Sequence, residues 1–232
     1  MDFIQENLAQ VEKNIQAACA RAGRDRGEVT LIAVSKTKPK EMLGCAYEAG
    51  IRDFGENKVQ ELCDKMESLQ EDIHWHMIGH LQTNKVKYII GRTKLIHSVD
   101  SLRLAQEIER QAAVHNVTVS VLIEVNVAGE ESKFGVPKRE AAALVRDISD
   151  FPHIRVCGLM TIAPFVENPE ENRVYFRELR QLSVDIASEN IDNVSMDILS
   201  MGMTGDYEVA IEEGATMVRV GTGIFGERNY NL

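Results

Sequence analysis

The sequence of 232 residues has no long hydrophobic run, no basic cluster and only four cysteines. None of its apolar stretches approaches the ~20 residues that a membrane helix requires. The N-terminus lacks the basic and apolar regions of a signal peptide, so we expect a cytoplasmic protein. The cysteines form no CxxC pair, which predicts reduced, mostly buried thiols and disfavours disulfides or metal ligands. They are Cys19, Cys45, Cys63 and Cys157.

The charge balance of the chain is acidic. Lys and Arg total 26 while Asp and Glu total 36, which gives a formal net charge of −10. Affinity for nucleic acid comes largely from basic side chains that neutralise phosphates, so we expect no nucleic-acid partner. The chain also lacks a linker rich in Pro, Gly or Ser and a low-complexity tract. We therefore expect a single domain over residues 1–232.

A regular alternation of strand and helix patterns follows an opening helix. Apolar residues recur at three- and four-residue steps up to about residue 22, and Gly23 has the position of a C-cap. Eight strand patterns come next, and each except the last is followed by a helical pattern. The expected strands are residues 29–36, 51–54, 74–78, 95–99, 118–126, 154–161, 195–200 and 216–220.

Strict alternation predicts parallel strands joined by helical crossovers. Eight such units in about 200 residues predict a single (β/α)8 barrel of the TIM type with an extra N-terminal helix. An open doubly wound sheet is the alternative, and the lack of a GxGxxG motif after the first strand argues against it. Because barrels keep their chemistry at the C-terminal ends of the strands, the residues there are the candidates for function.

Lys36 ends the first expected strand. A lysine amine that burial or a nearby positive charge keeps deprotonated can form a Schiff base with a carbonyl compound. On position alone, a structural ion pair with a carboxylate is the more frequent explanation. Lys38 is the rival amine, and because it precedes Pro39 we expect it in the loop, further from the barrel mouth.

Two neighbouring loops have the composition of a phosphate site. Residues 200–206 (SMGMTGD) and 219–223 (RVGTG) combine glycines with hydroxyl groups at strand ends, where a glycine backbone can approach an anion closely. Barrels often bind phosphate with the loops after strands seven and eight. Arg219 shares the strand parity of Gly221, so we expect its side chain to point into the barrel. Ordinary capped turns, and a structural salt bridge for Arg219, are the alternatives.

The lysine and the phosphate loops become neighbours if the barrel closes, because the last strand then pairs with the first. A Schiff-base lysine beside a phosphate cradle suits a phosphorylated aldehyde of cofactor size. It suits an aldose phosphate equally well, and spacing alone does not choose between them.

Two other motifs lie at expected strand ends. The run His74-Trp75-His76 with His80 nearby could indicate a metal, but a metal site needs three or four ligands in one place. Hydrogen bonding at the barrel mouth is the stronger expectation for His80. Asn57 follows the strand next to that of Lys36, where it is either the N-cap of the next helix or a ligand contact.

Seven stretches of the chain resemble the pyridoxal-phosphate homeostasis protein family. They are residues 33–37 (AVSKT), 54–57 (FGEN), 76–85 (HMIGHLQTNK), 133–135 (KFG), 158–161 (GLMT), 199–204 (LSMGMT) and 218–226 (VRVGTGIFG). The resemblance implies a barrel like the N-terminal domain of alanine racemase, with pyridoxal 5'-phosphate held by Lys36 as a Schiff base. It implies that Arg219 faces the pyridine nitrogen and that Asn57 lies close to the cofactor. The other implied contacts, mostly to the phosphate, are Ser200, Met201, Gly202, Gly221 and Thr222.

The resemblance also bears on whether the protein is an enzyme. A cation facing the pyridine nitrogen keeps it unprotonated and weakens the ring as an electron sink. In alanine racemase a tyrosine from a second domain supplies the second base. Here the chain ends at Tyr230-Asn231-Leu232, so we expect no second domain and assign no catalytic residue, with His80 the nearest candidate for a second base.

We therefore expect a monomeric cytoplasmic protein that holds, buffers or delivers pyridoxal phosphate, with apo forms of enzymes that use this cofactor as candidate partners. A pyridoxal-phosphate-dependent racemase or lyase is the first alternative. A Schiff-base aldolase acting on a sugar phosphate is the second, and it needs no cofactor.

Overall fold

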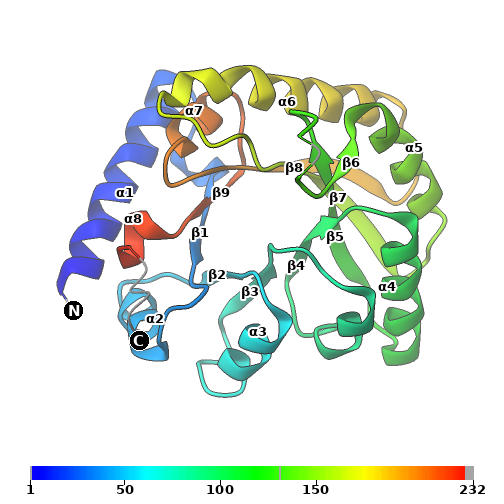
Figure 1. The fold of residues 1–232 in the computed structure, drawn as a ribbon, viewed down its shortest axis with the longest axis horizontal. Helices are drawn as coiled ribbons and strands as arrows, with labels where there is room; N and C mark the ends of the chain where they lie inside the picture. The colour runs from blue at the N-terminus through cyan, green and yellow to red at the C-terminus, as the bar shows by residue number, and fades with distance from the viewer. Residues whose placement is uncertain (1, 131, 228–232) are drawn as a thin grey trace.

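The structure is a computed structural model that describes residues 2–130 and 132–227. Eight parallel strands close into a barrel, with helices arranged around its outside (Figure 1). The order of hydrogen-bonded strands is β4-β3-β2-β1-β9-β8-β7-β5, and pairing of β4 with β5 completes the ring. The barrel expected from the strand–helix alternation is confirmed, and the open doubly wound sheet is excluded.

The strands and helices follow one another as the sequence patterns predict. The barrel strands are β1 (Thr30–Val34), β2 (Asp53–Glu56), β3 (His74–Met77), β4 (Leu95–Val99), β5 (Val119–Asn126), β7 (Ile154–Met160), β8 (Val194–Met203) and β9 (Met217–Val220), and the short β6 (Val136–Pro137) pairs with the end of β5. The helices are α1 (Asp2–Arg21), α2 (Lys40–Glu48), α3 (Val59–Met66), α4 (Leu102–His115), α5 (Lys138–Ser149), α6 (Arg173–Ser188), α7 (Tyr207–Glu212) and α8 (Thr222–Phe225). Three 3-10 helices complete the set: η1 (Arg26–Glu28), η2 (Thr83–Tyr88) and η3 (Pro169–Asn172).

Two apolar layers stabilise this arrangement. The larger lies between the strands and the surrounding helices, and α1 contributes to it with a buried stripe that includes Ile4, Leu8, Val11 and Ile15. The smaller is the inside of the barrel itself. Its buried members are Ile32, Leu95, Leu122, Cys157, Met160 and Met217. Because side chains alternate along a strand, a residue two positions away from one of these on a regular stretch of the same strand also points into the barrel.

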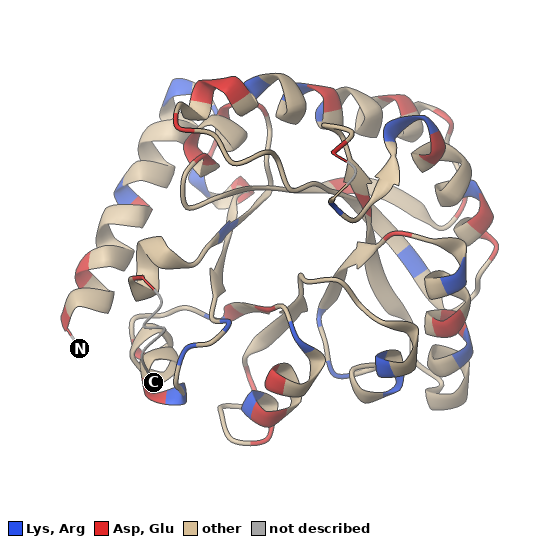
Figure 2. Ribbon diagram, in the orientation of Figure 1, with Lys and Arg blue, Asp and Glu red and all other residues tan. Residues whose placement is uncertain are grey.

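Charged residues lie mostly on the outer helices and loops, as Figure 2 shows. No helix in the described part of the chain is long and apolar enough to cross a membrane. All four cysteines are free thiols; Cys19 and Cys157 are buried, and Cys45 and Cys63 are partly exposed.

Two expected strand ends were wrong, and one helix was not expected. β1 ends at Val34, so Lys36 lies two residues beyond the strand, in a turn. β8 continues to Met203 through a register shift between Ser200 and Met203, so Gly202 belongs to the strand. This irregularity is a β-bulge, which inserts an extra residue and bends the strand. A short helix, α8, also follows the last strand, where no helical pattern was expected.

Candidate functional site

Lys36 lies in a tight turn at the C-terminal end of β1. The N–H of Lys38 donates to the carbonyl of Ser35 at 3.0 Å, which places Lys36 and Thr37 at the centre of the turn. Thr37 has φ of +63°, a left-handed conformation that is strained for a β-branched residue. Its N–H donates to Glu61 Oε1 at 2.6 Å. This contact from α3 helps to hold the lysine in one place at the barrel mouth.

A buried network lies beneath this turn. The amine of Lys65 donates to Glu56 Oε1 at 2.6 Å, to Glu61 Oε1 at 2.7 Å and to the carbonyl of Ser35 at 2.8 Å. The hydroxyl of Ser35 also donates to Glu56 Oε1, at 2.6 Å. Glu56 and Ser35 are fully buried and Lys65 is 3% exposed. The residue before Lys36 is therefore fixed through both its backbone and its side chain.

Lys38 contacts the end of α8. Its amine donates to the carbonyls of Phe225, Gly226 and Glu227 at 2.8–3.1 Å, at the C-terminal end of α8. Hydrogen bonds from lysine to the last carbonyls of a helix are a common form of capping. The amine of Lys38 is therefore bound at the C-terminal end of α8.

Arg219 points into the barrel, as its strand parity predicted. It is 4% exposed, and it donates from Nη1 to Ser200 Oγ at 2.5 Å and from Nη2 to the carbonyl of Thr161 at 2.8 Å. Burial lowers the pKa of Arg219 to about 10, which leaves it charged at neutral pH. Its two hydrogen bonds use two of the five N–H donors of a guanidinium. No ion pair among the described residues includes Arg219, so the alternative expectation of a structural salt bridge has no support.

The two glycine-rich loops meet at Thr204. The N–H groups of Gly221 and Gly223 lie 3.2 and 3.4 Å from Thr204 Oγ1, which accepts from both. Gly202 has φ of +90°, and a Cβ atom there would lie 2.6 Å from Ala210 Cβ, so only glycine fits. Backbone N–H groups thus converge on a small oxygen acceptor in front of β9, and phosphate oxygens are acceptors of the same kind.

The other sequence-predicted residues divide into two groups. Ser200 and Met201 are fully buried within β8, and the Ser200 hydroxyl contacts Arg219 inside the barrel. Gly221 and Thr222 lie at the start of α8, beyond β9. A Cβ atom on Gly221 would lie 3.4 Å from Val34 Cβ, which shows how closely this loop approaches the end of β1.

Asn57 completes the mouth on the side of β2. Val34 pairs with Gly55, and both chains then continue for two residues to Lys36 and Asn57. The N-cap of α3 is Lys58, so Asn57 does not have the expected alternative role as a cap. Its Oδ1 atom is buried with no hydrogen-bond partner in the described part of the protein. A buried carbonyl oxygen without a donor fits a ligand contact.

His80 lies at the mouth and takes part in loop contacts. Its Nδ1 is 3.3 Å from Asp100 Oδ2, and its ring stacks on Phe134 with 3.9 Å between centroids. His80 thus lies within ion-pair distance of Asp100, and its hydrogen-bonding role stays a prediction. The metal alternative gains no support, because the described residues contain no group of three or more His, Cys, Asp or Glu that could hold an ion.

Three residues of the barrel interior and one on α3 were missed from sequence. Asp53, His97 and Glu124 point inward from β2, β4 and β5. Lys65 supports the turn of Lys36 from α3. Glu124 is 4% exposed with Oε2 unpartnered, and burial, with the nearby charge of Asp100, raises its pKa to about 7. The alternation of polar and apolar residues along each strand could have indicated that these side chains point inward. Which of them meet inside the barrel depends on the strand register, which the sequence does not show.

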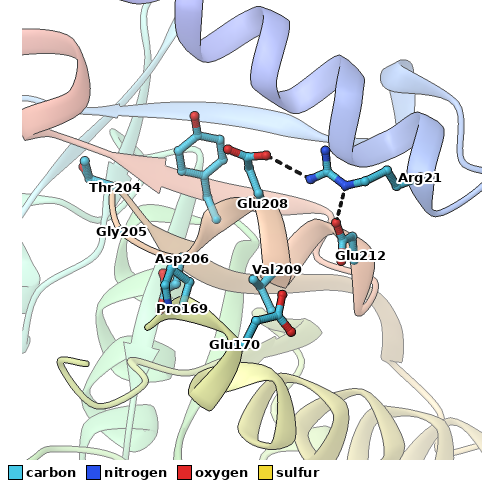
Figure 3. Close-up of a pocket in the computed structure, with 10 residues that line it drawn as sticks. Arg21, Pro169, Glu170, Thr204, Gly205, Asp206, Glu208, Val209 and Glu212 are labelled. Carbon is cyan, nitrogen blue, oxygen red and sulfur yellow. Dashed lines mark hydrogen bonds and ion pairs between the residues drawn. The ribbon is translucent and has the colours of Figure 1, made fainter. Parts of the chain in front are cut away.

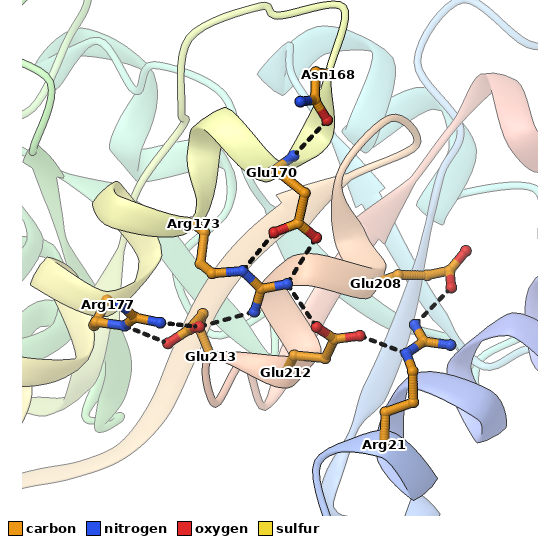
Figure 4. A network of polar contacts seen from close by, with 8 residues as sticks. All are labelled: Arg21, Asn168, Glu170, Arg173, Arg177, Glu208, Glu212 and Glu213. Carbon is orange, nitrogen blue, oxygen red and sulfur yellow. Dashed lines mark hydrogen bonds and ion pairs between the residues drawn. The ribbon is translucent and has the colours of Figure 1, made fainter.

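A surface pocket of about 450 Å³ lies outside the barrel, beside α1, α7 and η3 (Figure 3). Its lining includes Glu170, Glu208 and Glu212, with Arg21 bound to the last two. These carboxylates continue into a wider ion-pair network around Arg173, which links η3 and α6 to α7 (Figure 4). An acidic lining of this kind repels a phosphate, so the barrel mouth is the better candidate site.

Comparison with known proteins places this barrel in one family. The family profile described as "Alanine racemase, N-terminal domain" matches residues 7–229. A protein from Aquifex aeolicus (strain VF5) named "Pyridoxal phosphate homeostasis protein" is 50% identical over 226 residues, which cover 97% of this chain and 98% of the relative. The chain belongs to the pyridoxal phosphate homeostasis protein family. The resemblance inferred from seven sequence stretches is therefore confirmed.

Two solved structures support the same assignment. A crystal structure of a protein of unknown function from Bifidobacterium adolescentis has a TM-score of 0.92 at 38% identity, covering 97% of this chain and 95% of that one. PipY of Synechococcus elongatus PCC7942, solved with PLP bound, has a TM-score of 0.83 at 33% identity, covering 96% of this chain and all of that one. The barrel described above is thus shared with both proteins.

Proposed function

We propose that the protein binds pyridoxal 5'-phosphate at the barrel mouth and serves in the homeostasis of this cofactor. The observation that carries the proposal is the position of Lys36, which the strand register places between Asn57 and the Gly221 loop. Bound pyridoxal phosphate supplies an aldehyde, with which a lysine amine forms a reversible C=N bond with loss of water. The relatives named for pyridoxal phosphate homeostasis and the PLP-bound PipY support this assignment.

Each candidate residue has a task that its surroundings support. Lys36 would hold the aldehyde carbon, and its strained, network-supported turn would orient the amine. Gly202, Gly221 and Thr222, with Ser200 and Met201 of the adjoining strand, would hold the phosphate. Arg219 would donate to the pyridine nitrogen and keep it unprotonated, and Asn57 would contact the ligand through its unpartnered oxygen.

The wider role is buffering or delivery. We propose that the chain acts as a monomer with a single domain over residues 1–232, in the cytoplasm, and passes the cofactor to apo forms of enzymes that use it. Residues 228–232, including the ending Tyr230-Asn231-Leu232, lie outside the described residues. Two observations support delivery: the ligand site at the barrel mouth and the names of the relatives.

A transfer experiment tests this proposal. The protein is loaded with pyridoxal phosphate, freed of excess, and mixed with a defined apo-aminotransferase, whose recovered activity reports the transfer. Delivery predicts transfer faster than the spontaneous release of cofactor into a trapping solution. If the transfer rate equals the release rate, the protein buffers the cofactor but does not deliver it. Failure of the protein to bind pyridoxal phosphate would overturn the proposal.

An amino-acid racemase or lyase is the second candidate function, and one observation favours it. Glu124 is a buried carboxyl group whose pKa is raised to about 7, the range that suits a general acid or base at neutral pH. If it acts in this way, the loaded protein exchanges the α-proton of an L-amino acid with deuterated water over many turnovers, and Glu124→Gln stops the exchange. No exchange in the wild-type protein excludes this function for the amino acids tested.

A further inference from the structure

A chain of five hydrogen-bonded side chains crosses the inside of the barrel. It begins at the first residue of β2, at the N-terminal end of the barrel, and ends at Arg219 on β9. Its links are Asp53 Oδ1 to His76 Nε2 (2.9 Å), His76 Nδ1 to His97 Nε2 (2.9 Å), His97 Nδ1 to Ser200 Oγ (2.9 Å) and Ser200 Oγ to Arg219 Nη1 (2.5 Å). His76, His97 and Ser200 are fully buried.

The chemistry of the two ends fixes the direction of every bond between them. The Asp53 carboxylate only accepts, so His76 must donate from Nε2 and, when neutral, accept at Nδ1. His97 must then donate from Nε2 and accept at Nδ1. The Ser200 hydroxyl donates its proton to that nitrogen, and its oxygen accepts from Arg219, which can only donate. All the donors therefore point from the cation toward the carboxylate.

The surroundings keep both imidazoles neutral, as this direction requires. Burial lowers the pKa of His97 well below its ordinary value, and the neighbouring His76 and the Arg219 charge lower it further. Burial also lowers the pKa of His76, and this effect outweighs the opposing attraction of Asp53. Among the described residues, the other charged and titratable groups near the chain are Lys94 and His74 beside Asp53, which also lower the pKa of His76, and Glu124 and Asp206 near Arg219.

The chain gives Arg219 a link to a negative charge. Among the described ion pairs none involves this buried guanidinium, although an isolated buried cation is costly. The nearest carboxylate that its hydrogen bonds reach is Asp53, through three intervening side chains. In a low-dielectric interior, successive hydrogen bonds polarise and strengthen one another.

We propose that the carboxylate and the two imidazoles of this chain are positioning residues, which act through Ser200 to fix Arg219 as a donor at the ligand site. The inference rests on the proposed function, because it takes pyridoxal phosphate as the ligand that Arg219 meets. One consequence follows directly. The Ser200 proton is committed to His97, so Ser200 has no proton to donate to a phosphate while the chain is intact.

Asp53→Asn tests the direction of the chain with almost no change of shape. An amide can donate as well as accept, so the variant permits the reversed chain, as an Asp→Asn change beside a catalytic histidine does. Nitrogen-15 NMR of histidine-labelled, ligand-free protein reports which ring nitrogen carries the proton. We expect Nε2–H at both His76 and His97 in the wild-type protein, and a shift toward Nδ1–H at both in the variant.

The same variant tests the effect on the ligand. We expect its dissociation constant for pyridoxal phosphate to rise ~10-fold, the usual effect of losing an outer partner of a ligand-holding group, and the absorption band of the bound cofactor to shift. His97→Phe breaks the chain in another place and should have the same two effects. His74→Gln is the control, because this exposed residue contacts Asp53 but is not in the chain. Circular dichroism checks that each variant is folded.

The outcomes separate the two proposals. Nδ1–H at His76 or His97 in the wild-type protein, or changed tautomers in a folded Asp53→Asn protein with wild-type affinity and spectrum, would overturn the positioning role. A wild-type protein that does not bind pyridoxal phosphate would overturn the proposed function and, with it, the effect on the ligand. In that case the tautomers of the ligand-free protein would still decide the direction of the chain.

Discussion

Lys65 and Glu56 form a buried ion pair, 2.6 Å between Nζ and Oε1, directly beneath the turn that holds Lys36. Their side chains are 4% and 0% exposed. Water therefore screens the pair very little, and each charge depends on the other. The pair joins α3 to β2 and, through Ser35, to the end of β1.

Lys65→Met should destabilise the protein strongly. The methionine fills similar space but leaves Glu56 buried without its cation, which typically costs about 3–5 kcal/mol. Urea denaturation measures the change in the free energy of unfolding. Lys138→Met is the matched control, because its partner Glu178 is 3.0 Å away but both side chains are about 40% exposed or more, and such a pair contributes at most about 1 kcal/mol. Equal losses in the two variants would show that the buried pair has no special role.

Glu124→Gln should raise the stability of the protein at alkaline pH. Burial, with the nearby charge of Asp100, raises the pKa of Glu124 from 4.5 to about 7, so the folded state binds this proton more tightly than the unfolded state does. The group therefore stabilises the fold below pH 4.5, relative to higher pH, and this contribution is lost as pH rises to 7. It amounts to at most about 3 kcal/mol.

Denaturation of both proteins at pH 4.5 and pH 8 checks this sign. The variant should gain stability at pH 8 relative to the wild type, while the two should differ little at pH 4.5. Glu178→Gln, an exposed carboxyl on α6, is the control and should change neither value. A variant that loses stability at pH 8 would mean that the Glu124 carboxylate is well paired when ionised.

Gly202→Ala should destabilise the bulge of β8. The new Cβ would lie 2.6 Å from Ala210 Cβ and 2.9 Å from Tyr207 Cα, at a residue with φ of +90°. Strain of this kind costs about 1–3 kcal/mol, and binding of the phosphate should weaken with it. Gly44→Ala is the opposite control. Gly44 lies inside α2 with no atom near its would-be Cβ, so alanine there should stabilise by about 0.5–1 kcal/mol.

Arg173→Met should loosen the contact of α6 with α7. The guanidinium donates to Glu170, Glu212 and Glu213 at 2.7–2.9 Å and is 24% exposed. A network shares one ordered side chain among several partners, so we expect a loss of about 1–2 kcal/mol that shrinks at high salt. Arg139→Met is the control, since Arg139 is 83% exposed beside a single carboxylate. A loss that is independent of salt would point to packing of the arginine stem instead.

The sequence predicted much of the fold because its information is local. Apolar periodicity located each barrel strand to within a few residues, and the parity of Arg219 and Gly221 correctly placed the arginine inside. The ends of β1 and β8 were misplaced because a strand ends where its neighbours stop pairing, which no local pattern reports. The bulge at Gly202 let β8 continue through a glycine that normally indicates a turn.

The support of the site could not be predicted in the same way. The motif His74-Trp75-His76 suggested a metal, yet its second histidine bridges Asp53 and His97 from other strands. That contact follows from the register of β2, β3 and β4, which are more than 20 residues apart in sequence. The pairing of Lys65 with Glu56 depends likewise on how α3 packs on the barrel.

We propose that Lys36, and not its neighbour Lys38, holds the cofactor. Borohydride treatment of the pyridoxal-phosphate-loaded protein converts a lysine-bound cofactor into a stable secondary amine, and peptide mass spectrometry locates it. We expect one modified peptide, with the adduct on Lys36, that disappears in Lys36→Ala and persists in Lys38→Ala. An adduct on another lysine, or an undiminished adduct in Lys36→Ala, would contradict it.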